Sequence, residues 1–457
     1  MRVRITPGSR LRGSLVVPGD KSVAHRWLIL AATADGPSRL LGVPVSLDVR
    51  STASCLASLS PQGRPGLEAW IADGAAMGDG HGSTWNAGAL APADTSLEVE
   101  GEGWSSLAEP RGSLDCGNSG TAMRLLAGVC AASPFRSVLT GDESLSARPM
   151  ERVAEPLRAM GAEIATVEGH APITVEGGGL RGVTYETPVP TAQVKSAVLL
   201  AGLMAEGETT VLEPAPTRDH TEIALEALGV PVERDGTTVT IEPFQHGGLE
   251  GRVPGDPSTA AFLVAAAALT GSELTITDVG LNPTRTRFLD VMTRMGVRTE
   301  ARVGRRELGE PVGELWVGPC DGVRGTRVTE EELPLVIDEV PILAMMATHA
   351  SSDTWFLGAG ELRVKESDRL GALGRGIADL GGHGGVEGDD LVVAGGGLEG
   401  GSAHAHGDHR MAMAFVVAGL AAGAPVEIED VAAADVSFPG FVPALQALGA
   451  SIEVLAP

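Results

Sequence analysis

Apolar residues recur along this chain at helical spacing, and five of these stretches end in a glycine. In each copy two apolar residues lie three positions apart, which predicts the last turn of an amphipathic helix. The glycine stands where a residue in the left-handed conformation ends such a helix. Alternating polar and apolar residues follow, for example at 451–454, and predict a β-strand. The five copies occupy 157–161, 225–229, 292–296, 377–381 and 445–449.

The spacing of these copies divides the chain into related units. Successive copies start 68, 67, 85 and 68 residues apart. A weaker sixth copy without the glycine, 56–59, lies one period and about 33 extra residues before the first. The extra residues fall within about 61–104, a Gly/Ala/Asp-rich stretch of poor periodicity that we expect to form a surface excursion. We predict six α/β units of about 68 residues, longer than the repeats of a typical solenoid.

A second repeat, of higher order, relates the two halves of the chain. Residues 17–22 read VPGDKS and residues 253–258 read VPGDPS, 236 positions later, and both precede alanine-rich helical sequence. A chain of 457 residues is also too long for one hydrophobic core. We predict two domains of three units each. The N-terminal lobe would span residues 19–247, and the C-terminal lobe would combine residues 1–18 with 248–457.

Composition and charge argue against several classes of partner. No apolar run approaches the ~20 residues of a membrane span, and the N-terminus has no apolar signal core. The net charge of −25 disfavours binding to a nucleic-acid backbone or to an anionic membrane surface. The four cysteines lack C-x-x-C spacing, so we expect neither a zinc site nor a disulfide framework. Together these features favour the reduced cytoplasm.

Lysine is rare in this chain. Only three of its 34 basic residues are lysines: Lys21, Lys195 and Lys365. An ammonium is compact and its pKa can be tuned, whereas arginine presents a rigid fork that stays charged. The number of lysines alone fits chance retention as well as a functional role. The residues around each lysine are needed to distinguish these two explanations.

Polar islands interrupt the apolar helical sequence of the N-terminal half. At 20–26, DKSVAHR puts a serine and an arginine four apart near the positive end of a helix, which suits an anion, although a plain capped helix fits equally well. At 117–121, GNSGT offers a glycine turn without the Lys of a P-loop, and a plain turn is the simpler explanation. At 141–150 an arginine before proline is held extended. At 191–196 a glutamine can both donate and accept hydrogen bonds.

Three further islands lie in the C-terminal half. At 337–341 two acids adjoin an apolar stretch, where a partly desolvated carboxylate can act as a base. If a helix starts at about Lys365, Lys365 and Arg369 share one face, although a solvated charged face is the usual role of such a run. At 408–413 an arginine stands in the first turn of a helix, where a cation opposes the helix dipole unless it meets an anion.

Taken in order, these segments resemble the signatures of the enolpyruvyl transferases. The matching segments are PGDKSVAHR, GNSGTAMRLLAG, the RPM of GDESLSARPM, AQVKSAVLLAGL, IDEVP, LRVKESDRL and GDHRMAMAF, between residue 18 and about 416. The resemblance implies that family's α/β fold, an inside-out α/β barrel of two domains with three repeated β/α units each. It favours the branch that acts on shikimate 3-phosphate over the sister branch that acts on UDP-N-acetylglucosamine. Members of the sister branch typically use a loop cysteine, and no cysteine here stands in a comparable loop.

The resemblance also implies a reaction. The 5-hydroxyl of shikimate 3-phosphate would add to C2 of phosphoenolpyruvate while C3 is protonated, and the adduct would expel phosphate to leave an enol ether. No metal, redox group or organic cofactor would be needed. Asp338 with Lys365 would take the hydroxyl proton, Glu366 would protonate the methylene, and Lys21 would complete the catalytic set.

By the same resemblance, each substrate has its own set of residues. Shikimate 3-phosphate would be held by Lys21, Ser22, Arg26, Thr191, Ala192, Gln193, Asp338 and Lys365. Phosphoenolpyruvate would be held by Lys21, Asn118, Gly120, Arg148, Gln193, Arg369, His409 and Arg410. Lys195 would have only a supporting role in charge balance. We expect a monomer whose two lobes close over the substrates.

Some positions depart from the family pattern. Ala24 replaces a frequent serine, Ala192 leaves only the hydroxyl of Thr191 in a pair that often has two, and Val436 stands where some members have a lysine. The alternative from another functional class is a binding protein that has this fold but no catalytic activity. The intact set of Asp338, Lys365 and Glu366 argues against it.

Overall fold

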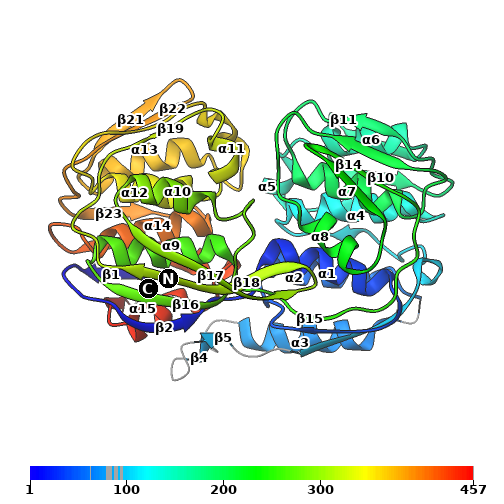
Figure 1. Ribbon diagram of the computed structural model, residues 1–457, viewed down its shortest axis with the longest axis horizontal. Coiled ribbons are helices and arrows are strands. Elements are labelled where there is room, and N and C mark those ends of the chain that lie inside the picture. Colours follow the sequence, from blue (N-terminus) through cyan, green and yellow to red (C-terminus); the bar gives the residue numbers. More distant parts are fainter. Residues whose placement is uncertain (62, 79–84, 87–90, 93–95, 456–457) are drawn as a thin grey trace.

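The computed structural model describes residues 1–61, 63–78, 85–86, 91–92 and 96–455. Two hydrophobic cores organise the chain, one in each lobe of Figure 1. The first core runs from Val23 to Val253. The second combines Val3–Val17 with residues 260–452, so the first strands of the chain pack with its last residues. The division into lobes at 18/19 and 247/248 stays a prediction, and Leu249 and Val253 belong to the first core.

Three sheets surround the second core, and the N-terminal strands take part in two of them (Figure 1). The first has the order β23 (Gly401–His404), β24 (Val426–Glu429), β1 (Arg2–Thr6), β25 (Ser451–Leu455). The second has the order β17 (Arg298–Glu307), β18 (Glu310–Gly318), β16 (Glu273–Gly280), β2 (Arg12–Val16). The third has the order β19 (Arg327–Val328), β20 (Thr354–Phe356), β22 (Asp390–Ala394), β21 (His383–Glu387).

Three more sheets surround the first core. One has the order β7 (Leu114–Asp115), β8 (Arg136–Thr140), β10 (His170–Glu176), β9 (Glu163–Val167). Another has the order β11 (Thr184–Glu186), β12 (Thr209–Leu212), β14 (Thr238–Ile241), β13 (Val232–Asp235). The last has the order β15 (Glu250–Arg252), β3 (Asp35–Leu41), β6 (Ser96–Glu102). A separate short ribbon pairs β4 (Trp85–Asn86) with β5 (Ala91–Pro92).

These six sheets repeat one pairing pattern. In each, a parallel pair at one edge is followed by antiparallel pairing, as in β7–β8 and then β8–β10–β9. The same sequence of pairings occurs in β11–β12–β14–β13 and in β2–β16–β18–β17. The mixed α/β class is therefore confirmed, and the repeat seen in the sequence corresponds to a repeat of sheets.

The glycine that closes each sequence copy ends a helix in the left-handed region, as predicted. The five glycines have φ values of 112°, 82°, 92°, 74° and 109°, and each precedes an edge strand of its sheet. The five helices are α6 (Glu151–Ala159), α8 (His220–Ala227), α10 (Arg287–Arg294), α13 (Arg369–Asp379) and α15 (Phe441–Ala447).

The sixth copy, which lacks the glycine, belongs to the sheet with three described strands. Here α2 (Leu47–Ser58) is followed not by an edge strand but by α3 (Pro65–Gly78). This helix packs closely on β6, since a Cβ on Gly66 would lie 1.9 Å from the carbonyl oxygen of Glu98. Leu67 and Trp70 of α3 are buried in the first core. The prediction of a surface excursion within 61–104 is therefore wrong for α3 and β6. Part of that stretch lies outside the described residues.

Each core is built around three buried helices. In the first core these are α1 (Lys21–Thr33), α4 (Gly120–Ala132) and α7 (Ala192–Gly202), and α4 contacts both of the others. In the second they are α9 (Pro257–Leu269), α12 (Val340–Ala347) and α14 (His409–Gly419). All six are apolar around most of their circumference, which explains why they lie inside rather than on the surface. Their small side chains, mainly alanine, permit close packing.

Short helical segments complete the fold. They are α5 (Glu143–Ser146), α11 (Leu333–Val336) and the 3₁₀ turns η1 (Trp104–Ser106), η2 (Ala359–Val364) and η3 (Val431–Val436). Within the described ranges, no helix has the length and apolar character needed to cross a membrane.

Candidate active site

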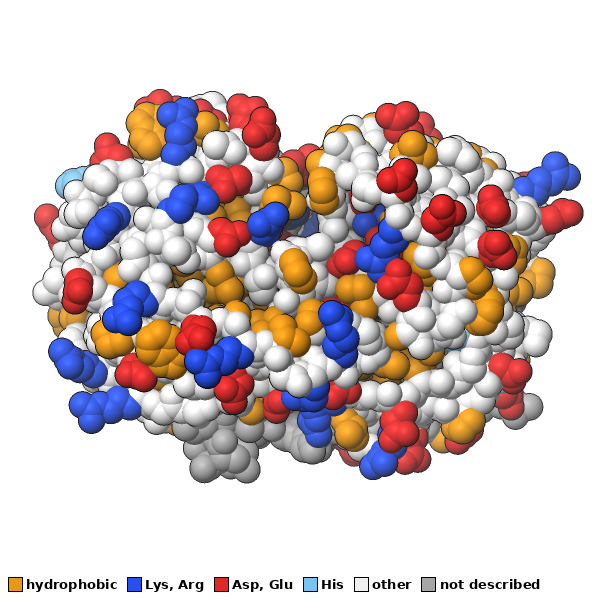
Figure 2. Space-filling view, viewed as in Figure 1, with side chains coloured by type: hydrophobic (Ala, Val, Ile, Leu, Met, Phe, Trp, Pro, Cys, Tyr) orange, Lys and Arg blue, Asp and Glu red, His pale blue; other side chains and the backbone are white. Residues whose placement is uncertain are grey.

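The candidate residues come from the starts of the buried helices and from loops that face them across the two lobes. Figure 2 shows the surface hollowed between the lobes, with charged side chains along both edges of the hollow. The lobes touch there, since Ser144 Oγ donates a hydrogen bond to the carbonyl oxygen of Glu366 at 3.2 Å. The predicted N-terminal and C-terminal sets are thus brought to one place.

Lys21 stands at the first position of α1. Asp20 caps this helix, accepting hydrogen bonds from the backbone of Ser22 and Val23. The ammonium of Lys21 donates to Asp48 Oδ2 at 2.7 Å. Burial alone would lower the pKa of Lys21, but Asp48 and Glu366 together raise it above its usual value. Lys21 is therefore a permanent cation at neutral pH.

Arg26 lies one turn further along α1 and is buried. It donates to Thr221 Oγ1, to the carbonyl oxygen of Ser22 and to Ser196 Oγ, each at 2.8 Å. Burial lowers the pKa of Arg26 to about 10. Three of its five N–H groups are thus used by the protein, so contact with a ligand would have to come from the remaining donors.

The glycine turn before α4 arranges a second cationic group. Ser119 caps α4 through its hydroxyl, and Gly120 begins the helix. Arg148 is buried and donates to Asn118 Oδ1 at 2.6 Å. A Cβ added to Gly120 would lie 2.8 Å from Arg124 Nη1 and 3.4 Å from Arg148 Nη1. Gly120 is therefore needed because two guanidinium groups approach the turn.

Gln193 connects α7 to the same region. Its amide donates to Thr121 Oγ1 at 2.8 Å, and its oxygen accepts from Arg124 Nη1 at 2.7 Å. Burial lowers the pKa of Arg124 to about 10, and the neighbouring Arg148 acts in the same direction. Thr191 and Ala192 begin α7, but the described contacts link neither side chain to another candidate residue.

Asp338 lies just before α12 among three guanidinium groups. Arg218 of the first lobe forms a short ion pair with Asp338 Oδ2. Arg369 and Arg410 lie 3.8 Å from its carboxylate oxygens. Burial would raise the pKa of Asp338, but Arg410 and Arg218 hold it well below its usual range. Asp338 is therefore a stable anion, not the weakly acidic carboxyl that its apolar sequence neighbours suggested.

Lys365 and Glu366 occupy an irregular loop rather than a helix. Lys365 ends the 3₁₀ turn η2, and α13 starts only at Arg369 after the capping residue Asp368. The expectation of a helix from about Lys365, with Lys365 and Arg369 on one face, is wrong. The Asp368 carboxylate accepts from the N–H of Gly371 and fixes the helix start four residues later than the charge pattern implied.

The two residues of this loop both have a lowered pKa, with different consequences for their charge. Burial lowers the pKa of Lys365 below its usual value, and Arg369 and Arg218 act in the same direction. For Glu366 burial acts upward, but Arg369 and Arg148 hold its pKa well below the usual range. An ammonium that releases its proton more easily than that of an ordinary lysine thus lies beside a carboxylate that strongly prefers its anionic form.

Arg369 is fully buried and joins the parts of the C-terminal set. It donates to Asp408 Oδ2 at 2.7 Å and pairs with Glu366 Oε2 at 2.8 Å. Asp408 also caps α14, whose first turn holds His409 and Arg410. Burial, with Lys21 nearby, lowers the pKa of His409 to about 3, so its ring is neutral at neutral pH. Arg410 donates to the carbonyl oxygen of Asp338 at 2.9 Å.

Several buried nitrogen atoms of the site have no hydrogen-bond partner among the described residues. They are Arg148 Nε, Arg369 Nη1 and His409 Nε2, and all three belong to the set expected to hold phosphoenolpyruvate. A buried polar group without a partner costs free energy. Donors left open in a cationic cavity are suited to an anionic ligand. Within the described chain, no group of three or more His, Cys, Asp or Glu side chains is placed to hold a metal ion.

Lys195 does not reach the site. It is buried on α7 between Glu213 and Glu222, at 2.6 and 2.7 Å from their carboxylate oxygens. Burial alone would lower the pKa of Lys195, but Glu222 and Glu213 raise it. The supporting role in charge balance expected from the sequence agrees with this geometry, since Lys195 neutralises two buried acids behind Arg26.

Sequence reasoning missed Arg218, Arg124 and Asp48. Arg218 stands in a loop before α8 and meets Asp338 of the other lobe, which no local pattern indicates. Arg124 ends the GNSGTAMR segment. Its position one helical turn after the glycine turn could have indicated that it belongs to the site. Asp48, on α2, is paired with Lys21 only through the tertiary fold.

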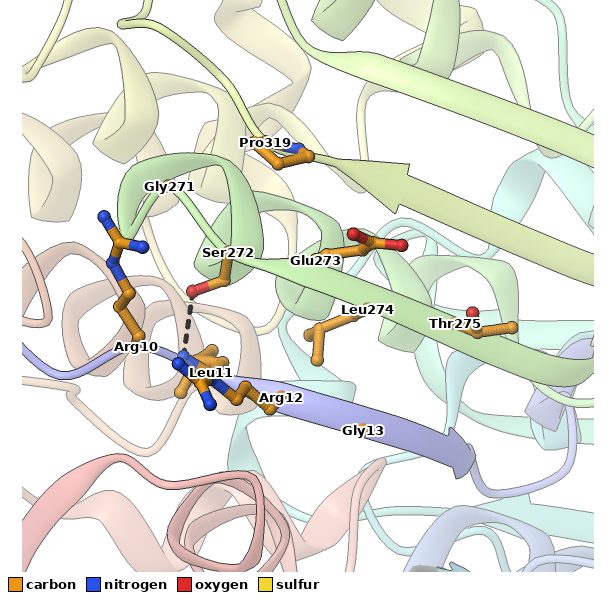
Figure 3. A pocket seen from close by; sticks show the side chains of 10 residues that line it. All are labelled: Arg10, Leu11, Arg12, Gly13, Gly271, Ser272, Glu273, Leu274, Thr275 and Pro319. Atoms are coloured by element: carbon orange, nitrogen blue, oxygen red, sulfur yellow. Dashed lines mark hydrogen bonds between the residues drawn. The ribbon is translucent and has the colours of Figure 1, made fainter.

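A separate cavity lies away from these residues, beside the starts of the paired strands β2 and β16 (Figure 3). Its volume is about 430 Å³, and its described lining contains no candidate residue. Arg10 and Arg12 flank it, and both side chains are exposed to solvent. It is therefore not part of the site described above.

Comparisons with known proteins identify the family to which this chain is similar. The family model of EPSP synthase (3-phosphoshikimate 1-carboxyvinyltransferase) matches residues 5–74 and 89–445. The 3-phosphoshikimate 1-carboxyvinyltransferase of Halorhodospira halophila is 46% identical over 99% of this chain and 97% of its own length. That of Acidithiobacillus ferrooxidans is 44% identical over 99% of both chains. The family match leaves out residues 75–88, which lie within the stretch where the insertion was expected.

Solved structures give the same result. EPSP synthase from Acinetobacter baumannii superposes with a TM-score of 0.82 at 37% identity, covering 99% of both chains. The enolpyruvyl transferase NikO from Streptomyces tendae superposes with a TM-score of 0.72 at 20% identity, covering 100% of this chain and 99% of its own. The second likeness supports the fold alone.

Proposed function

Since this chain belongs to the EPSP synthase family, we propose that it transfers the enolpyruvyl group of phosphoenolpyruvate to the 5-hydroxyl of shikimate 3-phosphate, releasing phosphate. The hydroxyl oxygen forms a bond to C2 while C3 gains a proton. The resulting tetrahedral adduct then loses phosphate and a proton from the new methyl group, which leaves 5-enolpyruvylshikimate 3-phosphate. This is a step of the shikimate pathway, toward aromatic amino acids.

The observation that carries the proposal is the cage of cations around Glu366 and Asp338. Lys21 and Arg148 of one lobe and Arg369 of the other all act on the charge of Glu366. The two substrates together bring roughly six formal negative charges, which such a preorganised cage stabilises. A protein of net charge −25 can bind such anions only where its cations are concentrated.

Phosphoenolpyruvate occupies the part of the site with open donors. Arg148, Arg369 and His409 present the buried N–H groups that have no partner in the described residues. Arg410, Asn118 and the start of α4 at Gly120 border the same region. Lys21 and Gln193 lie where both substrates meet. The positive end of α4 adds to the attraction for phosphate.

Shikimate 3-phosphate lies toward α1 and α7. Lys21, Ser22 and the free donors of Arg26 bind it from α1, and Thr191, Ala192 and Gln193 bind it from the start of α7. Asp338 and Lys365 face it from the second lobe. Arg218 joins this set, because its ion pair with Asp338 places a further cation at the same point.

The proposed proton transfers use the two residues of the C-terminal loop, Lys365 and Glu366. Lys365, whose pKa burial lowers, accepts the hydroxyl proton, and Asp338 orients that hydroxyl. Glu366 delivers a proton to the methylene and takes one back when phosphate leaves. Its carboxylate is held ionised by Arg369 and Arg148. Once these two arginines pair with substrate anions, their pull on Glu366 weakens and the carboxyl can carry the proton.

The finer architecture also belongs to the proposal. Each lobe is an inside-out barrel of three repeated β/α units, an arrangement supported by the three buried helices of each core. The lobes divide at 18/19 and 247/248, and they close further over the substrates. The protein acts as a monomer in the cytoplasm.

One assay tests the reaction. Phosphate release from phosphoenolpyruvate is followed with shikimate 3-phosphate and, in parallel, with UDP-N-acetylglucosamine. We expect turnover with the first acceptor only. Turnover with the UDP-sugar would assign the chain to the sister activity, and no turnover with either would indicate a binding protein.

A further inference from the structure

The two copies of the VPGD segment meet at the joint between the lobes. Gly19 and Gly255 form an antiparallel bridge. The N–H of Asp20 donates to the carbonyl oxygen of Pro254 at 2.7 Å, and the N–H of Asp256 donates to that of Pro18 at 2.8 Å. The joint therefore has approximate two-fold symmetry, with one copy from each crossover of the chain.

Each aspartate of this joint caps a buried helix. Asp20 Oδ1 accepts from the N–H groups of Ser22 and Val23 at the start of α1. Asp256 Oδ1 accepts from the N–H of Ser258 at the start of α9. Both capping aspartates are buried carboxylates, so each needs a nearby cation or further hydrogen-bond donors.

One guanidinium serves both aspartates. Arg285, in the loop between β16 and α10, is buried and donates to Asp20 through Nη1 and to Asp256 through Nη2, the latter at 2.9 Å. Nη2 also donates to Ser258 Oγ at 3.0 Å. Two carboxylates from the two crossovers thus share the fork of a single arginine, a geometry that lysine cannot reproduce.

A second group of contacts fixes the loop that carries Arg285. His220 Nε2 lies 3.2 Å from Arg285 Nη1, and its Nδ1 lies 2.6 Å from Glu310 Oε1. Asn282 donates to the other oxygen of Glu310 at 3.1 Å. With Arg285 donating to Nε2, the imidazole must carry its proton on Nδ1 and donate to Glu310. This chain of hydrogen bonds through His220, Glu310 and Asn282 fixes the position of the Arg285 guanidinium.

Both catalytic faces of the cleft connect to Arg285. On one side Asp20 is adjacent in sequence to Lys21 and holds the first turn of α1. On the other side Ser258 donates a short hydrogen bond to Glu339, the neighbour of Asp338. Arg285 itself is separated from the proposed reacting groups by these intermediaries, so its influence on the reaction is indirect.

We propose that Arg285 is a positioning residue that sets Lys21 and Asp338 relative to one another through Asp20 and through Ser258 and Glu339. The proposal rests on the reaction proposed above. A displacement of about 1 Å between reacting groups can cost on the order of a hundredfold in rate. Arg285 thus couples the geometry of the joint to that of the cleft.

The test uses full-length Arg285→Lys, which keeps the charge but cannot fork between both aspartates. We expect a folded protein whose kcat with phosphoenolpyruvate and shikimate 3-phosphate falls about 10- to 100-fold. The KM values should change less than kcat, because Lys21 and the other binding groups are still present. A folded variant with kcat within about twofold of wild type would overturn the proposal.

A matched pair keeps the proposal testable if Arg285→Lys does not fold. Asp20→Asn and Asp256→Asn each remove one charge facing Arg285, and asparagine can still cap the helix. We expect Asp20→Asn to lose more kcat/KM at a similar melting temperature, since of the two capped helices, α1 and α9, α1 is the one that carries substrate-binding residues. Equal activity losses in the two variants would contradict the proposal. Wild-type protein without turnover would instead remove the proposed function, and this inference with it.

Discussion

The two faces of the cleft differ in how their charges are held. On the N-terminal face Lys21 starts a buried helix and pairs with Asp48, and its pKa is raised. On the C-terminal face Lys365 ends a 3₁₀ turn in an irregular loop, and burial lowers its pKa. The same side-chain type is therefore a permanent cation on one face and a group that can release its proton on the other.

This difference follows from the neighbours that each lobe supplies. The N-terminal face offers helix starts and neutral donors such as Gln193, which bind anions without changing protonation. The C-terminal face crowds Asp338 and Glu366 together with Arg369 and Arg410, so charges there respond strongly to one another. In the proposed function both lobes bind substrate, whereas proton transfer belongs to the C-terminal face alone.

The largest effect should come from Lys365→Met. Removing the group that accepts the hydroxyl proton should lower kcat by about 1,000-fold, within the range typical of lost general acid–base catalysis. Lys365→Arg is the matched control, because it keeps the charge but cannot release a proton at accessible pH. Steady-state phosphate release measures both. Recovery of activity in Lys365→Arg would mean that charge, and not proton transfer, is what Lys365 provides.

The third lysine should show a loss of stability, not of chemistry. Lys195→Met leaves Glu213 and Glu222 buried without their cation, which should cost about 3–5 kcal/mol of unfolding free energy. Denaturant unfolding measures this loss. Arg4→Met, which removes the exposed pair with Glu427, should cost far less, because solvent screens that pair. Similar losses in the two variants would contradict the buried role of Lys195.

Lys21→Met should weaken binding on the N-terminal face. Losing charged hydrogen bonds to both substrates should lower kcat/KM about 100-fold. The pH dependence of kcat should keep its shape, because Lys21 does not titrate in the working range. Initial rates across pH test both parts. A changed pH profile would show that Lys21 takes part in proton transfer and would remove the contrast with Lys365.

Gly120→Ala should have a smaller and more selective effect. The new methyl group would crowd Arg124 and Arg148, so KM for phosphoenolpyruvate should rise about tenfold while KM for shikimate 3-phosphate changes little. Gly112→Ala is the control, because a Cβ there meets nothing within 4 Å. An equal rise in both KM values would place Gly120 between the substrates, not beside one of them.

The smallest effect should come from Arg152→Ala at the rim of the cleft. Arg152 and Glu361 pair across the lobes at 3.4 Å, and both side chains are well exposed. Such pairs contribute less than about 1 kcal/mol, so kcat should fall no more than about fivefold. Small-angle scattering with both substrates should still report closed lobes. Loss of closure in this variant would mean that the rim pair, and not the substrates, holds the lobes together.

Much of the fold could be predicted because it repeats. Glycine can adopt the left-handed conformation freely, so the helix ends at Gly161, Gly229, Gly296, Gly381 and Gly449 were visible in the sequence. The unit without the glycine was also one whose structure was mispredicted. There α3 replaces an edge strand, and its Gly- and Ala-rich composition resembles a loop although Leu67 and Trp70 are buried.

The site residues could be proposed from motifs, whereas their electrostatics could not. Nothing near Asp338 in sequence indicates that Arg218, 120 residues away, pairs with it. The pattern of charges around Lys365 suggested a helix because it has helical spacing, but Asp368 caps the helix later. Contacts between lobes and the exact start of a helix depend on tertiary packing, which local patterns do not contain.

The contrast between the two faces can be measured on the protein itself, because the chain has three lysines. Lysine labelled with ¹³C at Cε gives three resonances, which Lys→Arg variants assign, and titration in the alkaline range yields each pKa. The account predicts that Lys365 titrates below an ordinary lysine, and Lys21 and Lys195 above it. Titration of Lys21 at or below the pKa of Lys365 would contradict it.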